Sequence, residues 1–233
     1  MKTQPTIKPR KPLSFAIFAS LMALAILFMT SCSKNDTQGN PAALIMAANT
    51  AQGSVAQDFY IDGTKLNASA LAYSQSTSYF QVTSGDTHQG QFKTSSNSTV
   101  DASFSAQLAP AGYYSVYFGD NNSANIYQND RTTPQGSDAR VRFINLSSGV
   151  TSNVDFALNA GTKLTTVASA LANKVGSAYY EATTLSSTFT LNVTGSSSVL
   201  LSIPVVLQAG KIYSIVISGS SSTTLTYSLV AEN

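Results

Sequence analysis

Apolar and polar residues alternate along most of the chain, after an unbroken apolar run between about residues 13 and 29 near its start. Beyond residue 42, apolar side chains recur at every second position over short stretches. A period of two predicts a β-strand with one buried face and one solvated face. We therefore expect an all-β fold. The clearest stripes cover residues 100–108, 154–158, 189–193, 213–217 and 225–229.

Turn-forming residues separate these stripes and set the expected architecture. Residues 195–198 and 219–222 are rich in glycine and serine and predict hairpin loops. Only residues 166–175, which are rich in alanine, would suit a short helix, and the β-branched residues among them argue against it. About seven short strands per unit favour an immunoglobulin-like antiparallel β-sandwich, with a small barrel as the alternative.

The stripes belong to an internal repeat. Residues 58–66 (DFYIDGTKL) are echoed by residues 155–164 (DFALNAGTKL), and residues 108–115 by residues 207–214. Tyr79-Phe80 is likewise echoed by Tyr179-Tyr180. The spacing of roughly 100 positions exceeds the units of roughly 20–50 residues that build solenoids, so we expect whole domains in tandem.

The repeat also sets the predicted domain boundaries. A first β-sandwich, the more degenerate copy, covers residues 43–130, and a second covers residues 138–233. Residues 131–137 gather turn formers and predict a linker between them. The expected fold is thus two tandem immunoglobulin-like antiparallel β-sandwich domains that follow a lipoprotein signal peptide.

The start of the chain has the organisation of a secretory signal. Basic residues between positions 2 and 11 precede the apolar run, and small residues follow it, so we interpret residues 1–31 as a signal peptide. The segment that ends at Cys32, the only cysteine, resembles the lipobox of bacterial lipoproteins, although Met29 stands where leucine is commoner. An ordinary signal peptide and an uncleaved anchor helix are the alternatives.

The lipobox resemblance implies that Cys32 is acylated and becomes the mature N-terminus, with residues 32–42 as a lipidated tether. A single acyl chain binds a membrane only marginally, whereas two or more hold stably. Ser33, rather than an acid, follows the cysteine and points to the outer membrane. Whether the protein lies on the periplasmic or the surface face stays open.

Composition narrows the possible partners. The formal net charge is +2, but the signal holds several basic residues and no acid, so no basic face is left for nucleic acid. Charged residues are 10% of the chain and hydrophobic residues 43%, which allows a buried core. One cysteine permits no intramolecular disulfide, and one histidine leaves too few ligands for a zinc site.

Candidate catalytic groups are sparse. His88, the only histidine, lies between glycines, and we interpret it as a solvated loop residue rather than a base. No Gly-x-Ser-x-Gly elbow marks a hydrolase serine. A glycosidase would need two carboxylates about 5–10 Å apart. The carboxylates considered for such a pair are Asp58, Asp62, Asp86, Asp101, Asp120, Asp155 and Glu181.

Two acidic features have structural interpretations. Asp58 and Asp155 occupy equivalent positions in the repeat next to predicted core aromatics, so we interpret them as loop braces. Residues 120–122 (Asp-Asn-Asn) offer hard oxygen ligands for calcium, although a plain turn is favoured. We expect no enzyme activity, no cofactor and no metal site.

Tyrosines are the remaining candidates for ligand binding, because the chain has no Trp but 11 Tyr. Amphipathic tyrosines serve recognition surfaces, and ordinary sheet tyrosines are the alternative. Tyr114 and Tyr213 follow an Ala-Gly turn and predict either a tyrosine corner or a core aromatic. The candidates for an outward-facing, glycan-binding surface are Tyr79, Tyr113, Tyr117 and Tyr179.

A family resemblance rests mainly on the second unit. The residues that carry it are Asn145, Val154, Asp155, Phe156, Gly161, Thr162, Lys163, Leu207, Ala209, Gly210 and Tyr213. This pattern resembles the domain of unknown function 4397, found in exported bacterial proteins, frequently in tandem and frequently as lipoproteins of the Bacteroidota. The first unit lacks the Val-Arg-Phe opening of residues 141–143. The resemblance implies an extracytoplasmic β-sandwich and carries over no catalytic residue.

These observations favour a non-catalytic lipoprotein of the cell envelope whose sandwiches act as surface spacer, adhesion or assembly modules. The alternative is a glycan-binding accessory lipoprotein of a polysaccharide uptake system. The expected partners are the membrane, through the N-terminal lipid, and glycan or envelope proteins, with no role for nucleic acid.

Overall fold

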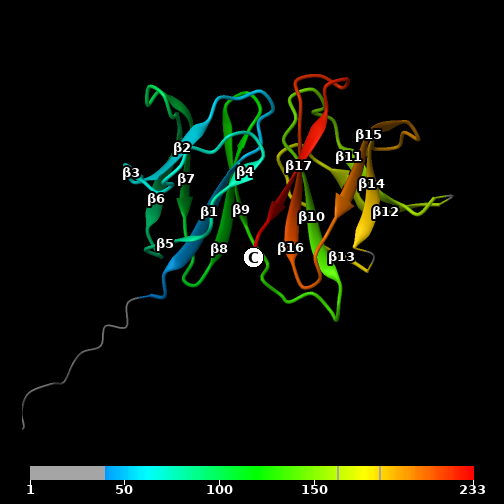
Figure 1. The fold of residues 1–233 in the computed structure, drawn as a ribbon, viewed down its shortest axis with the longest axis horizontal. Helices are drawn as coiled ribbons and strands as arrows, with labels where there is room; N and C mark the ends of the chain where they lie inside the picture. The colour runs from blue at the N-terminus through cyan, green and yellow to red at the C-terminus, as the bar shows by residue number, and fades with distance from the viewer. Residues whose placement is uncertain (1–39, 162, 184) are drawn as a thin grey trace, which may run out of the picture. The chain divides into compact units, whose positions relative to one another are not determined.

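The computed structural model describes residues 40–161, 163–183 and 185–233, and residues Asn40–Asn233 form one compact unit (Figure 1). The predicted signal peptide, Cys32 and most of the predicted tether lie outside the described residues. All regular elements of the described part are strands, as the alternating stripes predicted. Within that part, no helix is long and apolar enough to cross a membrane. The short helix considered for residues 166–175 is instead strand β12 (Leu164–Leu171), because β-branched residues fit the pleated sheet better.

The first sandwich consists of two sheets built from β1 to β9. Its first inner sheet has the order β4–β1–β8–β9, and β5 also pairs with β1. Its first outer sheet has the order β3–β2–β6–β7. The inner strands are β1 (Ala43–Asn49), β4 (Gln75–Ser76), β5 (Phe80–Val82), β8 (Tyr113–Gly119) and β9 (Ser123–Gln128). The outer strands are β2 (Gln57–Ile61), β3 (Thr64–Lys65), β6 (Thr87–Thr94) and β7 (Val100–Gln107).

The second sandwich repeats this plan with β10 to β17. Its second inner sheet has the order β13–β10–β16–β17, and its second outer sheet has the order β12–β11–β14–β15. The inner strands are β10 (Ala139–Asn145), β13 (Tyr180–Ala182), β16 (Ile212–Ser218) and β17 (Thr226–Ala231). The other outer strands are β11 (Val154–Asn159), β14 (Ser186–Val193) and β15 (Val199–Val206). Hairpin loops join β14 to β15 and β16 to β17, where the sequence predicted them.

Each sandwich also contains one parallel strand pair, so the sheets are not wholly antiparallel as expected. β1 runs parallel to β8, with Ala47 opposite Val116, and β10 runs parallel to β16, with Phe143 opposite Ile215. The first strand of each sandwich therefore joins the inner sheet beside the penultimate strand. Local alternation cannot reveal this arrangement, because it reports which face of a strand is buried and not which strand lies beside it.

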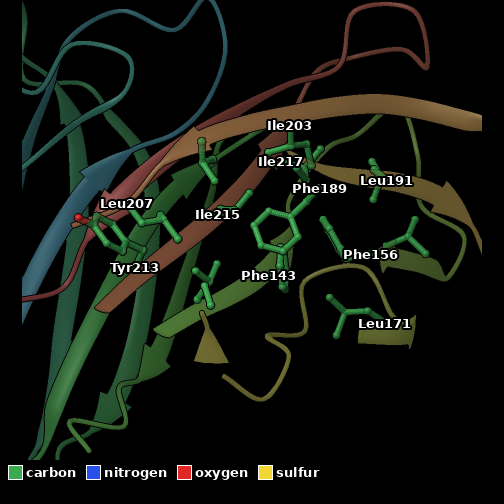
Figure 2. Close-up of a cluster of buried hydrophobic side chains, with 14 of the residues drawn as sticks. Phe143, Phe156, Leu171, Phe189, Leu191, Ile203, Leu207, Tyr213, Ile215 and Ile217 are labelled. Atoms are coloured by element: carbon green, nitrogen blue, oxygen red, sulfur yellow. The ribbon is translucent and has the colours of Figure 1, made fainter. Parts of the chain in front are cut away.

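The predicted stripes form the core of each sandwich. In the second sandwich, Phe143, Phe156 and Phe189 are fully buried, and their rings pack with centroids 4.6 Å and 5.1 Å from Phe143. Figure 2 shows these rings between the two sheets, with Leu191, Ile215 and Ile217 around them. The core of the first sandwich likewise contains three buried phenylalanines, Phe59, Phe92 and Phe118.

Both predicted tyrosine corners are present. The Tyr114 hydroxyl accepts a hydrogen bond from the Ala109 backbone N–H at 2.9 Å, and the Tyr213 hydroxyl accepts one from Gln208 at 3.1 Å. Both rings are also buried in their cores, so the two interpretations hold together. Gly210, in the turn before Tyr213, has a φ of +73°, which glycine adopts at little cost.

A third apolar cluster joins the two sandwiches. Met46, Ala48 and Tyr117 on the first inner sheet pack with residues of the second sandwich. Those partners are Ile144, Leu146, Val216 and Val230. The central strands of the inner sheets are thus buried on both faces, and every residue of β10 and β16 is buried. The segment between β9 and β10, where a linker was predicted, contains no strand.

Candidate functional site

The four candidate tyrosines do not form an outward-facing row. Tyr117 is fully buried where the two inner sheets meet, because the second sandwich covers the face on which its ring lies. It is therefore not an exposed ligand-binding residue. Tyr79, Tyr113 and Tyr179 are half-buried. The Tyr79 and Tyr113 rings meet edge to face at 5.3 Å, and the Arg131 guanidinium lies 4.7 Å from the Tyr113 centroid.

The centre of the junction is a buried ion pair. Arg142 Nη2 donates to Glu232 Oε1 at 2.6 Å, and the two side chains are 4% and 0% exposed. The Tyr179 hydroxyl donates to Glu232 Oε2 at 2.6 Å, and the Tyr117 hydroxyl donates more weakly to Oε1 at 3.4 Å. Ser214 also donates to Glu232. The carboxylate is therefore surrounded by donors, as a buried charge requires.

Arg142 reaches across the junction as well. Its Nη1 donates to the Gln128 carbonyl at 3.0 Å, and its Nη2 donates to Asn129 Oδ1 at 2.9 Å. Its Nε donates to Ser214 at 3.1 Å. Gln128 and Asn129 end the first sandwich, so the guanidinium fixes the register of the two inner sheets. We define Arg142, Glu232, Tyr117, Tyr179 and Asn129 as the junction cluster.

The electrostatics of the junction cluster keep its phenols neutral. Burial, and then the charge of Glu232, raise the pKa of Tyr117 and of Tyr179 above the usual range of tyrosine, although Arg142 partly opposes the shift. Both hydroxyls therefore remain donors to Glu232 at ordinary pH. This arrangement can hold two modules together but offers no activated nucleophile.

His88 does not lie in a solvated loop, as the sequence suggested. It is on β6, is 4% exposed, and its Nδ1 lies 2.6 Å from Asp62 Oδ2. Its Nε2 lies 2.9 Å from the Thr83 carbonyl oxygen and 3.5 Å from the Thr83 hydroxyl. The flanking glycines predicted a loop around His88, but Gly90 belongs to the same strand as His88.

The Thr83–His88–Asp62 arrangement looks like a catalytic triad but lacks its chemistry. In a triad, the histidine nitrogen opposite the carboxylate must accept the proton of the hydroxyl nucleophile. Here that nitrogen lies closer to the Thr83 carbonyl oxygen, which can only accept, than to the Thr83 hydroxyl. The group instead ties the turn after β2 to β6. The backbone N–H of Gln89 and, secondarily, His88 lower the pKa of Asp62.

The repeat-equivalent aspartates make bracing contacts. Asp155 Oδ1 accepts hydrogen bonds from the Ala170 backbone N–H at 2.8 Å and from the Thr194 hydroxyl at 2.9 Å, which connects three segments. These bonds, with Ala170 first, lower the pKa of Asp155. Asp58 instead pairs with Lys65 Nζ at 2.8 Å. Among the described residues, no group of three or more His, Cys, Asp or Glu could hold a metal ion.

Asp120 lies at the end of the junction where β8 stops. Its Oδ2 accepts hydrogen bonds from the backbone N–H of Gly219 at 2.7 Å and of Ser148 at 3.1 Å. The carboxylate of the first sandwich thus clamps two loops of the second. Asn121 and Asn122 follow with φ of 54° and 52°. Residues 120–122 form the turn between β8 and β9, which confirms the favoured interpretation.

A polar hollow of about 490 Å³ lies beside Asp120. Four loops line it, two from each sandwich, namely those after β1, β8, β10 and β16. Sequence reasoning singled out residues 120–122 but not the other three loops, because these loops meet residues 120–122 only through the junction. Its polar lining residues are Gln52, Ser54, Asp120, Asn121, Asn122, Ser148, Ser220 and Thr224.

A second hollow of about 480 Å³ lies in the first sandwich between residues 66–71 and 75–80. Its apolar residues include Leu66, Leu71 and Phe80, and Gln75 and several serines contribute polar groups. None of the four candidate tyrosines lines either hollow.

Comparison with known proteins supports the domain resemblance. Residues 43–156 match the family model described as "Domain of unknown function (DUF4397)", from β1 into β11. The match thus covers the first sandwich and only the start of the second, although the resemblance in sequence rested mainly on the second unit. Among solved structures, the crystal structure of CBMbc (family CBM26) from Eubacterium rectale Amy13K in complex with maltoheptaose is similar, with 10% identity and a TM-score of 0.31. The similarity covers 82% of this chain and 97% of that chain, and a likeness this distant carries no functional argument. No curated protein matches the chain.

Proposed function

We propose that this chain is a non-catalytic lipoprotein of the bacterial outer membrane whose two sandwiches act as one rigid spacer or assembly block. The observation that carries the proposal is the junction cluster together with the apolar cluster around Tyr117. If the two sandwiches moved independently, the junction cluster and the apolar cluster around Tyr117 would be exposed to water. Here, separating the sandwiches would expose an apolar surface and strip Arg142 of its partners on the first sandwich.

The attachment point of the block supports a spacer role. The Pro41 carbonyl accepts hydrogen bonds from the Ser84 hydroxyl at 2.8 Å and from the Ala111 backbone N–H at 3.2 Å. The first sandwich therefore holds the chain from Pro41, one residue before the proposed tether ends. A lipid on Cys32 would hold the block through a short tether, and two or more acyl chains would make that attachment stable.

The exposed faces and the single histidine support a non-catalytic role. Gln89, Ser103 and Ser105 are exposed on the first outer sheet and contribute polar groups to its outer surface. His88 is buried, and both of its ring nitrogens lie within hydrogen-bond distance of protein oxygens.

Two measurements test the proposal. Cys32→Ala should release the protein from the outer membrane or leave it unprocessed; normal processing with unchanged membrane attachment would rule out the lipid anchor. For the block, spin labels at Ser103→Cys and Thr166→Cys report the distance between the outer sheets in a chain that starts at Ser33. A single narrow distance distribution is expected, and a broad one would mean that the sandwiches move independently.

A glycan-binding accessory lipoprotein is the second candidate. The specific observation in its favour is the polar hollow beside Asp120, which hydroxyl, amide and carboxylate groups line. Glycan and envelope proteins therefore remain the proposed partners, beside the membrane.

A further inference from the structure

We propose that the hollow beside Asp120 is a binding site for a neutral saccharide and exists only when the two sandwiches are joined. This inference rests on the second candidate function and names its site. Its starting point is position: ligand sites occur preferentially where modules meet, in hollows of about 300–1,000 Å³. The hollow of about 490 Å³ lies at such a boundary and takes two loops from each sandwich.

The loops around the hollow are held in place before any ligand arrives. Asp120 Oδ2 bonds both Ser148 and Gly219, and the Gly149 N–H donates to the Gly219 carbonyl at 2.9 Å. On the first-sandwich side, Ser54 donates to the buried Asn49 Oδ1 at 2.9 Å. A site that is ordered in advance loses less conformational entropy on binding.

The lining groups select the ligand class. Asp120 is the only charged residue that lines the hollow, so an anion would meet repulsion, and no second carboxylate is present to share a divalent cation. The two hydrogen bonds of Asp120 both use Oδ2. Gln52, Asn121 and Asn122 each carry an amide that can donate and accept. Such a mixture matches vicinal hydroxyl groups, which donate and accept in the same way.

The absence of an aromatic side chain from the lining predicts how the saccharide binds. Stacking of a sugar ring on Tyr or Phe cannot contribute here, so hydrogen bonds must supply the specificity. Removal of two amides should therefore weaken binding strongly. The loss of two hydrogen bonds of average strength corresponds to roughly 10-fold weaker binding or more.

The backbone conformation of the turn allows a clean variant. Asn121 and Asn122 have φ of 54° and 52°, where glycine is less strained than asparagine. The double variant Asn121→Gly/Asn122→Gly thus removes both amides without forcing the loop to change. Ser98→Gly is the matched control, since Ser98 has a φ of 60° but lies outside the hollow.

The test is an NMR titration of the chain from Ser33 onward, which contains all described residues, with side-chain amide signals as the readout. The probes are neutral gluco-, manno- and N-acetylglucosamine oligosaccharides, a uronic-acid oligosaccharide and calcium chloride alone. A neutral oligosaccharide should shift the signals of Asn122 and Gln52, bind at least 10-fold more weakly to the double variant, and bind normally to Ser98→Gly.

Three results would overturn the proposal: no shift with any neutral probe, equal binding by the double variant, or shifts produced only by calcium or the acidic probe. Backbone spectra and melting temperature show whether each variant is folded. Failure here would leave the rigid-block proposal intact, because the distance between spin labels on the outer sheets tests that separately.

Discussion

Arg142 and Glu232 form an ion pair 2.6 Å long whose side chains are almost completely shielded from water. Both residues belong to the second sandwich, yet Arg142 also donates to Gln128 and Asn129 of the first. The ion pair inside the second sandwich is therefore linked directly to the end of the first sandwich. Because transferring two charges from water is costly, its main effect is to fix which surfaces meet and in what register.

The first prediction concerns removal of one partner. Glu232→Ala should lower the free energy of unfolding by about 3–5 kcal/mol, because it leaves the Arg142 charge buried without compensation. Thermal and urea unfolding measure the change. The double variant Arg142→Met/Glu232→Met should recover much of the loss, since it removes both charges. A Glu232→Ala protein as stable as wild type would show that the pair is not needed in the folded state.

The second prediction is that residues 138–233 unfold cooperatively on their own, but at a lower temperature than the whole chain. Their core, from Phe143 to Ile217, is contained within the second sandwich. Without the first sandwich, Ile144, Leu146 and Val216 become a solvent-exposed apolar patch, which promotes association. Calorimetry and sedimentation measure these effects, and Val216→Thr should reduce the association. A fragment without a cooperative transition would mean that the two sandwiches depend on a common core.

A third prediction follows from the contact between Gly90 and Phe104, which are opposite each other on β6 and β7. A Cβ atom on Gly90 would lie 1.9 Å from the Phe104 ring. Gly90→Ala should therefore destabilise the protein by about 1–3 kcal/mol, as overpacking does. Adding Phe104→Leu should partly relieve the clash, so the two changes should be non-additive. Additive losses in urea unfolding would argue against this contact.

The fourth prediction concerns pH. Hydrogen bonds, first from the Ala170 N–H, lower the pKa of Asp155 in the folded protein. The ionised Asp155 carboxylate therefore stabilises the folded protein fully above its unfolded pKa of about 3.9. This stabilisation is lost as the pH falls through the lower pKa that Asp155 has in the folded protein. Asp155→Asn should be less stable than wild type at pH 7, and the difference should shrink towards pH 2. Melting curves at several pH values, with the exposed Asp86→Asn as control, measure it. If the difference in melting temperature between wild type and Asp155→Asn did not change with pH, the charge of Asp155 would have no role in stability.

Much of the fold could be predicted because it depends on local alternation. Phe156, Phe189 and Ile215 were assigned to buried faces from a period of two alone, and all are fully buried. The tyrosine after a repeated Ala-Gly turn predicted either a tyrosine corner or a core aromatic, and Tyr114 and Tyr213 combine the two. These features lie within a few residues of the groups that determine them.

The junction could not be predicted in the same way. Alternation implies one solvated face, which predicted that Tyr117 lies outside. The structure instead buries both faces of the central strands of the inner sheets, and Tyr117 with them. A signal was present in the nearly continuous apolar run of residues 212–217, since strands covered on both faces lose their alternation. Glu232 had no such signal, because its partner Arg142 is 90 positions away and an acid near a chain end is ordinarily solvated.

Pro41 is bonded to one end of the first sandwich, and the seven-residue strand β1 follows it. β1 begins two residues after Pro41, and the loop after its last residue, Asn49, lines the hollow beside Asp120. At about 3.3 Å per residue, the strand carries the chain roughly 20 Å from one end of the sandwich to the other. The hollow therefore lies at the opposite end of the first sandwich from Pro41, where the described chain enters it.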